Sequence, residues 1–127
     1  MINTYKQYLN RENILTFQDM EFLHNDLIIE IVNDEEALEL YNELIDDAIR
    51  YSQIRAKWIN MNNDEKKNID ATRTCSHNAL ITDFNILSRY LKLKGKNTFW
   101  KEKLGDDRKL IGDFACYIVF INSINSR

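Results

Sequence analysis

Residues 69–91 read IDATRTCSHNALITDFNILSRYL, and side chains of one face recur there at every third or fourth position. That face consists of Ile69, Arg73, His77, Leu80, Phe84, Leu87 and Leu91. At about 100° per residue the stripe is about 80° wide, as on a helix that packs one face on a core. Lys92 and Lys94 followed by Gly95 are typical of a helix C-terminus. The sequence therefore predicts a long helix from about Asp64 to Lys94.

The rest of the chain carries the same helical signals. Thr16 with Asp19, and Asn33 with Glu36, are typical of helix N-termini, and we expect Asp106 to cap the last helix. The predicted helices cover residues 3–10, 16–33, 34–60, 64–94, 97–104 and a last segment after residue 106. With no proline and three glycines in 127 residues, tight turns between strands have little support. We predict an all-α fold, a helical bundle of three to four long helices plus one or two short helices, in a single domain over residues 1–127.

Polar side chains interrupt the apolar stripe of the long helix. Asp70, Arg73 and His77 lie within two turns of one another. Because an unpaired charge in a core is costly, we expect Asp70 to pair with Arg73, and Arg73 to lie against His77. A second polar stripe, about a quarter-turn away, consists of Asn78, Asn85 and Arg89. These six residues either form a structural hydrogen-bonded cluster or bind a ligand, and Arg73 with His77 are the candidates for catalysis.

The opposite side of this helix is also apolar, which predicts a central position in the bundle. That side consists of Cys75, Ala79, Ile86, Tyr90 and Leu93. We therefore expect Cys75 to be a core thiol. The other histidine, His24, stands alone in an acidic stretch, and we expect it to face solvent.

The long helix resembles one found in a family of small, all-helical bacterial or phage proteins. The shared run is Asp70-x-x-Arg73-x-x-x-His77-Asn78-x-Leu80-Ile81, continued by Asn85-x-Leu87-x-Arg89. The family carries Asp where this chain has Asn78, and the resemblance covers about twenty residues. It implies a helical fold and a set of polar residues, with no established activity attached.

HEPN ribonucleases give a second comparison, since they are helical bundles with an Arg and a His on one helix. Four to six residues lie between the Arg and the His in that family, whereas three residues lie between Arg73 and His77. The chemistry that the comparison suggests is an arginine that stabilises phosphate charge and a histidine that moves a proton.

Composition restricts the partners and cofactors. The net charge of −3 makes nucleic acid an unlikely partner for the surface as a whole, although residues 89–109 carry eight basic and three acidic side chains. Two histidines and two isolated cysteines, with no ligand spacing between them, predict no metal and no cofactor. The chain has no membrane-spanning run and no secretory signal, and reduced Cys75 and Cys116 fit a cytoplasmic protein.

The function expected from these features is that of a non-enzymatic helical binding or interaction protein. Sixteen isoleucines and fifteen asparagines are typical of AT-rich coding sequences, which favours an accessory or regulatory protein of a phage or mobile element. The last helix and the short helix before it are rich in aromatics, so we expect a homodimer, and a protein partner is a further expectation. The alternative is a metal-independent, phosphate-handling enzyme, a HEPN-like ribonuclease centred on Arg73 and His77.

Overall fold

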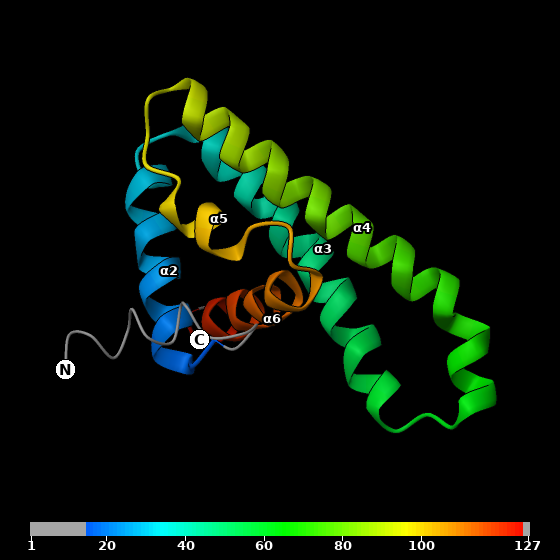
Figure 1. Ribbon diagram of the computed structural model, residues 1–127. Helices are drawn as coiled ribbons and strands as arrows, with labels where there is room; N and C mark the ends of the chain where they lie inside the picture. The colour runs from blue at the N-terminus through cyan, green and yellow to red at the C-terminus, as the bar shows by residue number, and fades with distance from the viewer. Residues whose placement is uncertain (1–14, 126–127) are drawn as a thin grey trace.

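The computed structural model describes residues 15–125, and within that range every regular element is a helix (Figure 1). The helices are α2 (Phe17–Ile31), α3 (Glu35–Ile59), α4 (Asn63–Leu93), α5 (Phe99–Leu104) and α6 (Arg108–Asn125). The all-α prediction, with three to four long helices and a short one, is confirmed. The helix predicted over residues 3–10 lies outside the described residues.

The ends of the helices follow the predicted capping chemistry, with two corrections. Thr16 and Asp19 form a reciprocal capping box at the start of α2, as predicted. The cap of α3 is Asp34 rather than Asn33, since its carboxylate accepts from the Ala37 amide. Similarly, Asp107 rather than Asp106 accepts from an amide in the first turn of α6. In both places two adjacent side chains are good N-caps, and the path of the backbone selects the second.

Gly95 ends α4 in the way that the sequence predicts. Its φ angle is +74°, a left-handed conformation that glycine adopts without a steric penalty. The Gly95 amide donates to the Lys92 carbonyl and the Lys96 amide to the Leu91 carbonyl, which is the Schellman arrangement. The chain can therefore turn back from α4 toward α5.

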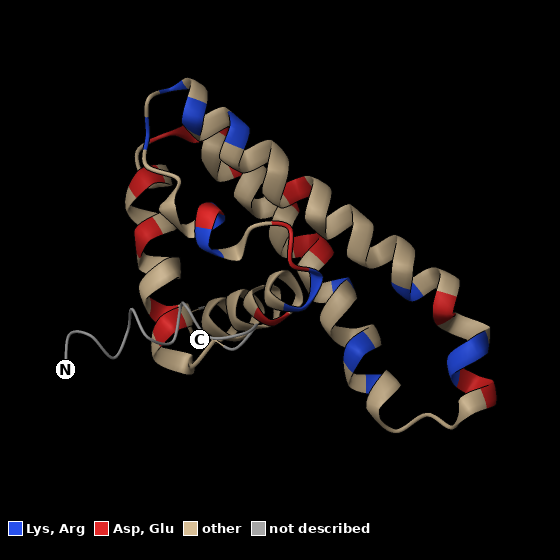
Figure 2. Ribbon diagram, in the orientation of Figure 1, with Lys and Arg blue, Asp and Glu red and all other residues tan. Residues whose placement is uncertain are grey.

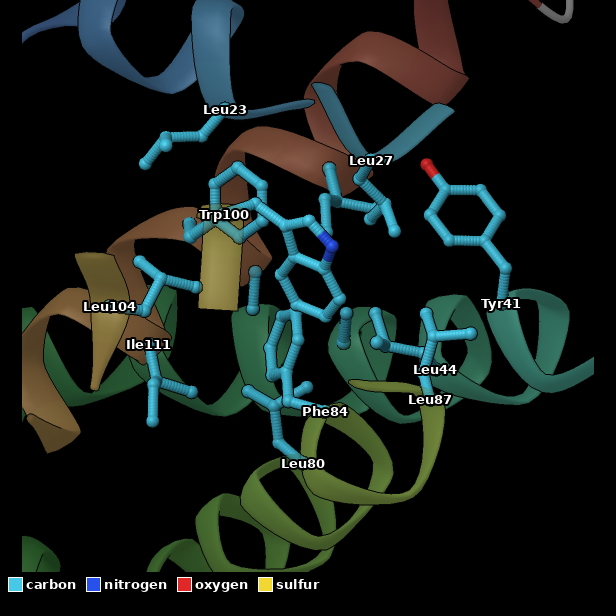
Figure 3. Packing of buried hydrophobic residues seen from close by; sticks show 14 of the residues in the cluster. Leu23, Leu27, Tyr41, Leu44, Leu80, Phe84, Leu87, Trp100, Leu104 and Ile111 are labelled. Atoms are coloured by element: carbon cyan, nitrogen blue, oxygen red, sulfur yellow. The ribbon is translucent and has the colours of Figure 1, made fainter. Parts of the chain in front are cut away.

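Helices α3 and α4 form a long antiparallel pair, and the other helices pack on one end of it (Figure 1). Helix α3 contacts α2, α4 and α6, and α6 contacts α2, α3 and α4, so these two helices rather than α4 occupy the central positions. The core lies between these helices and the short α5, whose Trp100 is fully buried beside Phe84 of α4 (Figure 3). The lower parts of α3 and α4 project beyond this core.

The prediction that α4 is buried on two sides is wrong. The stripe from His77 to Leu91 is its packing face, but Cys75 is exposed, and Leu93 is 82% exposed. Helix α4 lies at the edge of the molecule, where one face is enough to hold it. Apolar residues on its outer side therefore remain in contact with solvent, and Cys75 is not a core thiol.

The prediction for His24 is also wrong, because its side chain is only 7% exposed. Its Nε2 lies 2.6 Å from the hydroxyl of Tyr41 on α3, and that hydroxyl accepts a hydrogen bond from Asn122 of α6. Burial lowers the pKa of His24 from 6.5 to about 4. A neutral His24 therefore belongs to a polar network that joins three helices.

Most of the aromatic side chains on α5 and α6 are buried within the chain itself. Trp100 and Phe114 are fully buried and Tyr117 is 5% exposed, whereas Phe120 is 49% exposed and contacts Phe17 of α2. The surplus of apolar side chains on the last helix is thus mostly covered by α2, α3 and α4. Over residues 15–125, no helix is both long enough and apolar enough to cross a membrane.

Candidate anion-binding site

A hollow of about 300 Å³ opens where the middle of α4 faces α3 and the first turn of α6. Its lining is Tyr51, Arg55, Arg73, Thr74, His77, Arg108 and Lys109. Helix spacing explains the set, because Tyr51 and Arg55 on α3, and Arg73 and His77 on α4, are each four positions apart and so share a face. Three helices therefore place four cationic side chains around one histidine.

His77 forms the buried wall of this hollow and is only 6% exposed. Its ring stacks on that of Tyr51, with 4.8 Å between the ring centroids. Burial lowers the pKa of His77, as do the positive charges of Arg108, Arg73 and Arg55, while a hydrogen bond to the Arg108 backbone opposes the change. The Nε2 atom is buried and has no hydrogen-bond partner among the described residues. His77 thus contributes a neutral imidazole with one buried, unpaired nitrogen at the wall of the hollow.

Tyr51 is held against His77 by the close approach of α3 to α6. A Cβ atom at Gly112 would lie 2.7 Å from the Tyr51 hydroxyl oxygen, so no larger residue fits at this position without displacing the ring. The glycine in the middle of α6 therefore sets the position of the aromatic wall of the hollow.

The four cations of the hollow differ in how far their charges are compensated. Arg55 donates to Asp113 at 2.5 Å, and Lys109 donates to the other oxygen of the same carboxylate at 3.1 Å. Arg108 donates to the amide oxygen of Asn78, which is neutral. A single carboxylate is thus shared by two of the four cations and compensates one of the four charges.

Arg73 has the least compensated of these charges. Its guanidinium carbon lies 4.6 Å from the centroid of the Trp58 ring, and its buried Nε has no hydrogen-bond partner within residues 15–125. A buried donor of this kind is costly unless something accepts from it. The unpaired Nε of Arg73 and the unpaired Nε2 of His77 are two such groups on one wall.

Asp70 does not take the predicted place beside Arg73. It is exposed, and no ion pair joins it to Arg73 within the described part of the chain. Asp70 instead lines a separate hollow with Trp58, because position 70 lies at the edge of the stripe and near the end of the helix pair, where solvent reaches it. The predicted Asp70–Arg73 pair is therefore wrong, and Arg73 packs on an indole ring instead.

The second polar stripe divides between two places. Asn78 borders the His77 hollow through its hydrogen bond from Arg108. Asn85 and Arg89 lie two to three turns farther along α4 and line a different hollow of about 360 Å³, beside Lys101 of α5. The six residues selected from the sequence thus do not form one site; Arg73, His77 and Asn78 are the ones that the fold brings together.

Sequence reasoning missed Tyr51, Arg55, Arg108 and Lys109. A signal existed for each pair, since Tyr51 and Arg55 follow helical spacing and Arg108 with Lys109 come directly after an N-cap residue. What no local pattern shows is that residues 51, 77 and 108 meet.

The chemistry of this hollow favours an anion. Guanidinium groups match phosphate and carboxylate oxygens, and the lining holds three of them with an ammonium group and an imidazole. A metal ion has little to bind here, and residues 15–125 contain no group of three or more side chains suited to hold one. Comparison with family models, with curated proteins and with solved structures finds no match for the chain.

Proposed function

We propose that the protein is a non-enzymatic binding protein that recognises an anionic group of its partner in the His77 hollow. The observation that carries this proposal is the pair of buried, unpartnered nitrogens, Arg73 Nε and His77 Nε2, within a cluster of four cations. An oxyanion placed between them would accept from Arg73 and meet the His77 ring. An accessory or regulatory role in a phage or mobile element fits an amino-acid composition typical of AT-rich coding sequences. A location in the cytoplasm fits the two free cysteines.

The charge distribution supports this proposal. Lys and Arg lie on the lower half of α3 and at the start of α6, while acids line α2 and the first half of α3; the lower end of α4 carries both signs of charge, and its upper end is basic (Figure 2). A net charge of −3 therefore conceals a locally positive face. Clustered charge of one sign raises the local concentration of an oppositely charged ligand and its rate of association.

Titration with inorganic phosphate, followed by the nitrogen resonances of His77 and Arg73, tests this function. We expect both side chains to shift together and Arg73→Gln to weaken binding at least about tenfold. Arg89→Gln is the matched control, because Arg89 is an exposed arginine of the same helix in the other hollow. Equal losses in the two variants, or no shift at His77, would overturn the proposal.

A second candidate function is metal-independent cleavage of RNA at the same site. It is favoured by one observation, the lowered pKa of His77 together with its free Nε2. A neutral imidazole can take the proton of a ribose 2′-hydroxyl as that oxygen attacks the adjacent phosphate, while Arg73 binds the phosphate charge; the bond to the 5′-oxygen of the next nucleotide breaks, that oxygen takes up a proton, and a 2′,3′-cyclic phosphate remains. Cleavage of single-stranded RNA in the presence of a chelator, abolished by His77→Gln, would favour this candidate over simple binding.

We also propose that the chain forms a homodimer. Phe17, Phe120 and Ile124 remain exposed, and the first two are in contact with each other. A two-fold partner would cover them with an identical patch. Sedimentation at micromolar concentration is expected to show a dimer that Phe120→Asp dissociates; a single species near 15.1 kDa in the unmodified protein contradicts this proposal.

A further inference from the structure

A second hollow, of about 410 Å³, lies toward the end of the helix pair. Its lining is Trp58, Asn63, Lys66, Lys67 and Asp70. Arg73 connects the two, since it lines the first hollow and its guanidinium lies against the Trp58 ring at 4.6 Å. The side chain of Arg73 thus lies between the Trp58 ring and the candidate anion site at His77.

We propose that the two hollows together bind a nucleotide, with a phosphate in the His77 hollow and the base against Trp58. This inference rests on the proposed function, because it takes anion binding at His77 as given and names the ligand that carries the anion. The chemical class is a phosphate ester that bears a planar, heteroaromatic base. A carboxylate or a free phosphate would leave the Trp58 hollow unused.

The Trp58 hollow has the groups that a base requires. A tryptophan face stacks on any base, because every base has a planar π face. Two cationic groups already lie over the indole ring, since Lys66 Nζ lies 5.5 Å and Arg73 Cζ lies 4.6 Å from its centroid, so a base that stacks on Trp58 takes the place of one of them. The guanidinium of Arg73 is itself planar and can stack on a base while it donates to a phosphate.

The polar lining of the Trp58 hollow adds donors and acceptors at its rim. Asn63 offers an amide and Asp70 a carboxylate, both exposed and neither paired in the described part of the chain, so each is free to meet the edge of a base. Lys66 and Lys67 lie in the first turns of α4 beside the acidic Asp64 and Glu65, so the surface around this hollow carries both signs of charge. This local surface is compatible with nucleotide binding although the net charge of the whole chain is negative.

The test measures tryptophan fluorescence, because the two tryptophans differ in access. Trp58 is half-buried at the hollow, whereas Trp100 is fully buried in the core. The probes are adenosine 5′-monophosphate, ribose 5-phosphate and inorganic phosphate. We expect the nucleotide to quench Trp58 and to bind at least about tenfold more tightly than ribose 5-phosphate, in line with one stacked base.

Substitution of the aromatic surface completes the test. Trp58→Leu is expected to abolish the difference in affinity between the nucleotide and ribose 5-phosphate; because both probes are measured in the same variant, any change in phosphate binding that follows from the lost contact with Arg73 affects them equally. Phe22→Leu is the matched control, because Phe22 is an exposed aromatic of α2, far along the chain from the two hollows. Circular dichroism melting verifies that both variants fold, and quenching in the unmodified protein tests stacking without any substitution.

The outcomes separate this inference from the function on which it rests. If ribose 5-phosphate and the nucleotide bind equally, the base is not recognised; the nucleotide inference is overturned and anion binding stands. If inorganic phosphate also fails to bind, both are overturned. A free nucleotide and a nucleic-acid strand are distinguished with a short single-stranded oligonucleotide: a strand partner predicts tighter binding with a steeper salt dependence, and a free-nucleotide partner predicts no gain.

Discussion

Acidification should destabilise the fold through His24, which lies in the core between α2, α3 and α6. Its neutral ring meets the Tyr41 hydroxyl, and burial lowers its pKa from 6.5 to about 4. The unfolded chain binds a proton at this residue below about pH 6.5, whereas the folded chain resists it until about pH 4. Stability contributed by the neutral ring is therefore present above pH 6.5 and is lost as the pH falls toward 4.

The magnitude follows from the linkage between proton binding and folding. At about 1.4 kcal/mol for each pKa unit, a fall from 6.5 to about 4 sets a ceiling of about 3.4 kcal/mol. About 2 kcal/mol of this is lost between about pH 7.5 and about pH 5, because the unfolded chain is then mostly protonated and the folded chain is not. For a domain of this size such a loss is a large fraction of the total stability.

Urea unfolding of the parent protein and of His24→Gln at these two pH values measures this contribution. The glutamine side chain cannot take up a proton in this range, so the parent is expected to lose about 2 kcal/mol more than the variant on acidification. His77 is present in both proteins, and its own titration cancels in the comparison. Equal losses in parent and variant would refute the reasoning, as would a measured His24 pKa near 6.5 in the folded protein.

Three further outcomes concern the packing and charge of α4 and α6. Gly112→Ala should lower the free energy of unfolding in urea by about 1–3 kcal/mol, because its Cβ would lie 2.7 Å from the Tyr51 hydroxyl oxygen; an unchanged midpoint would mean that the ring moves aside. Burial, a hydrogen bond with Asp47 and the negative charge of Asp47 raise the pKa of Asp83 to about 8. The stability that protonated Asp83 contributes at low pH is therefore lost as the pH rises toward 8. Asp83→Asn should therefore gain about 1–2 kcal/mol over the parent between about pH 5 and about pH 9, allowing for solvent screening; a difference that is the same at both pH values would contradict this. Arg73→Ala should cost about 1–2 kcal/mol in thermal melts through its lost contact with an indole ring, and an unaltered melting temperature would show that this contact adds nothing.

The helices could be predicted from the sequence because their signals are local. The stripe from His77 to Leu91 is the packing face of α4, and Gly95 ends that helix as predicted. The caps of α3 and α6 were each misplaced by one residue, where neighbouring side chains have equal capping chemistry. Local chemistry therefore predicts that a helix begins near these residues, and tertiary structure selects which of them is the N-cap.

Burial was predicted less well, because it depends on what lies opposite each face. Cys75 was expected in the core on the assumption that α4 has neighbours on two sides, and α4 has them on one. The acidic residues that flank His24 along the chain led to the prediction that it faces solvent. Its spacing from Leu27 and Ile31 places it on the buried stripe of α2, a signal that was present in the sequence and was overlooked.

Only the part of the candidate site that lies on α4 could be predicted from the sequence. Arg73 and His77 share a helix, so their proximity follows from spacing alone. Tyr51 and Arg108 come from helices whose register against α4 is set by side-chain packing over the whole core. Without that register, no sequence pattern links residues 51, 77 and 108.

The projecting ends of α3 and α4 have a dynamic consequence. From residue 52 to residue 76 no side chain is buried, although most of this stretch is helical. Helices held by so few interior contacts open at a low free energy, independently of global unfolding. Backbone amides of this segment should therefore exchange with deuterium by local opening, while those of residues 77–91 exchange only when the whole domain unfolds. A ligand that spans Trp58 and His77 would tie this loose end to the rigid core, and its binding would appear as slowed exchange across the segment.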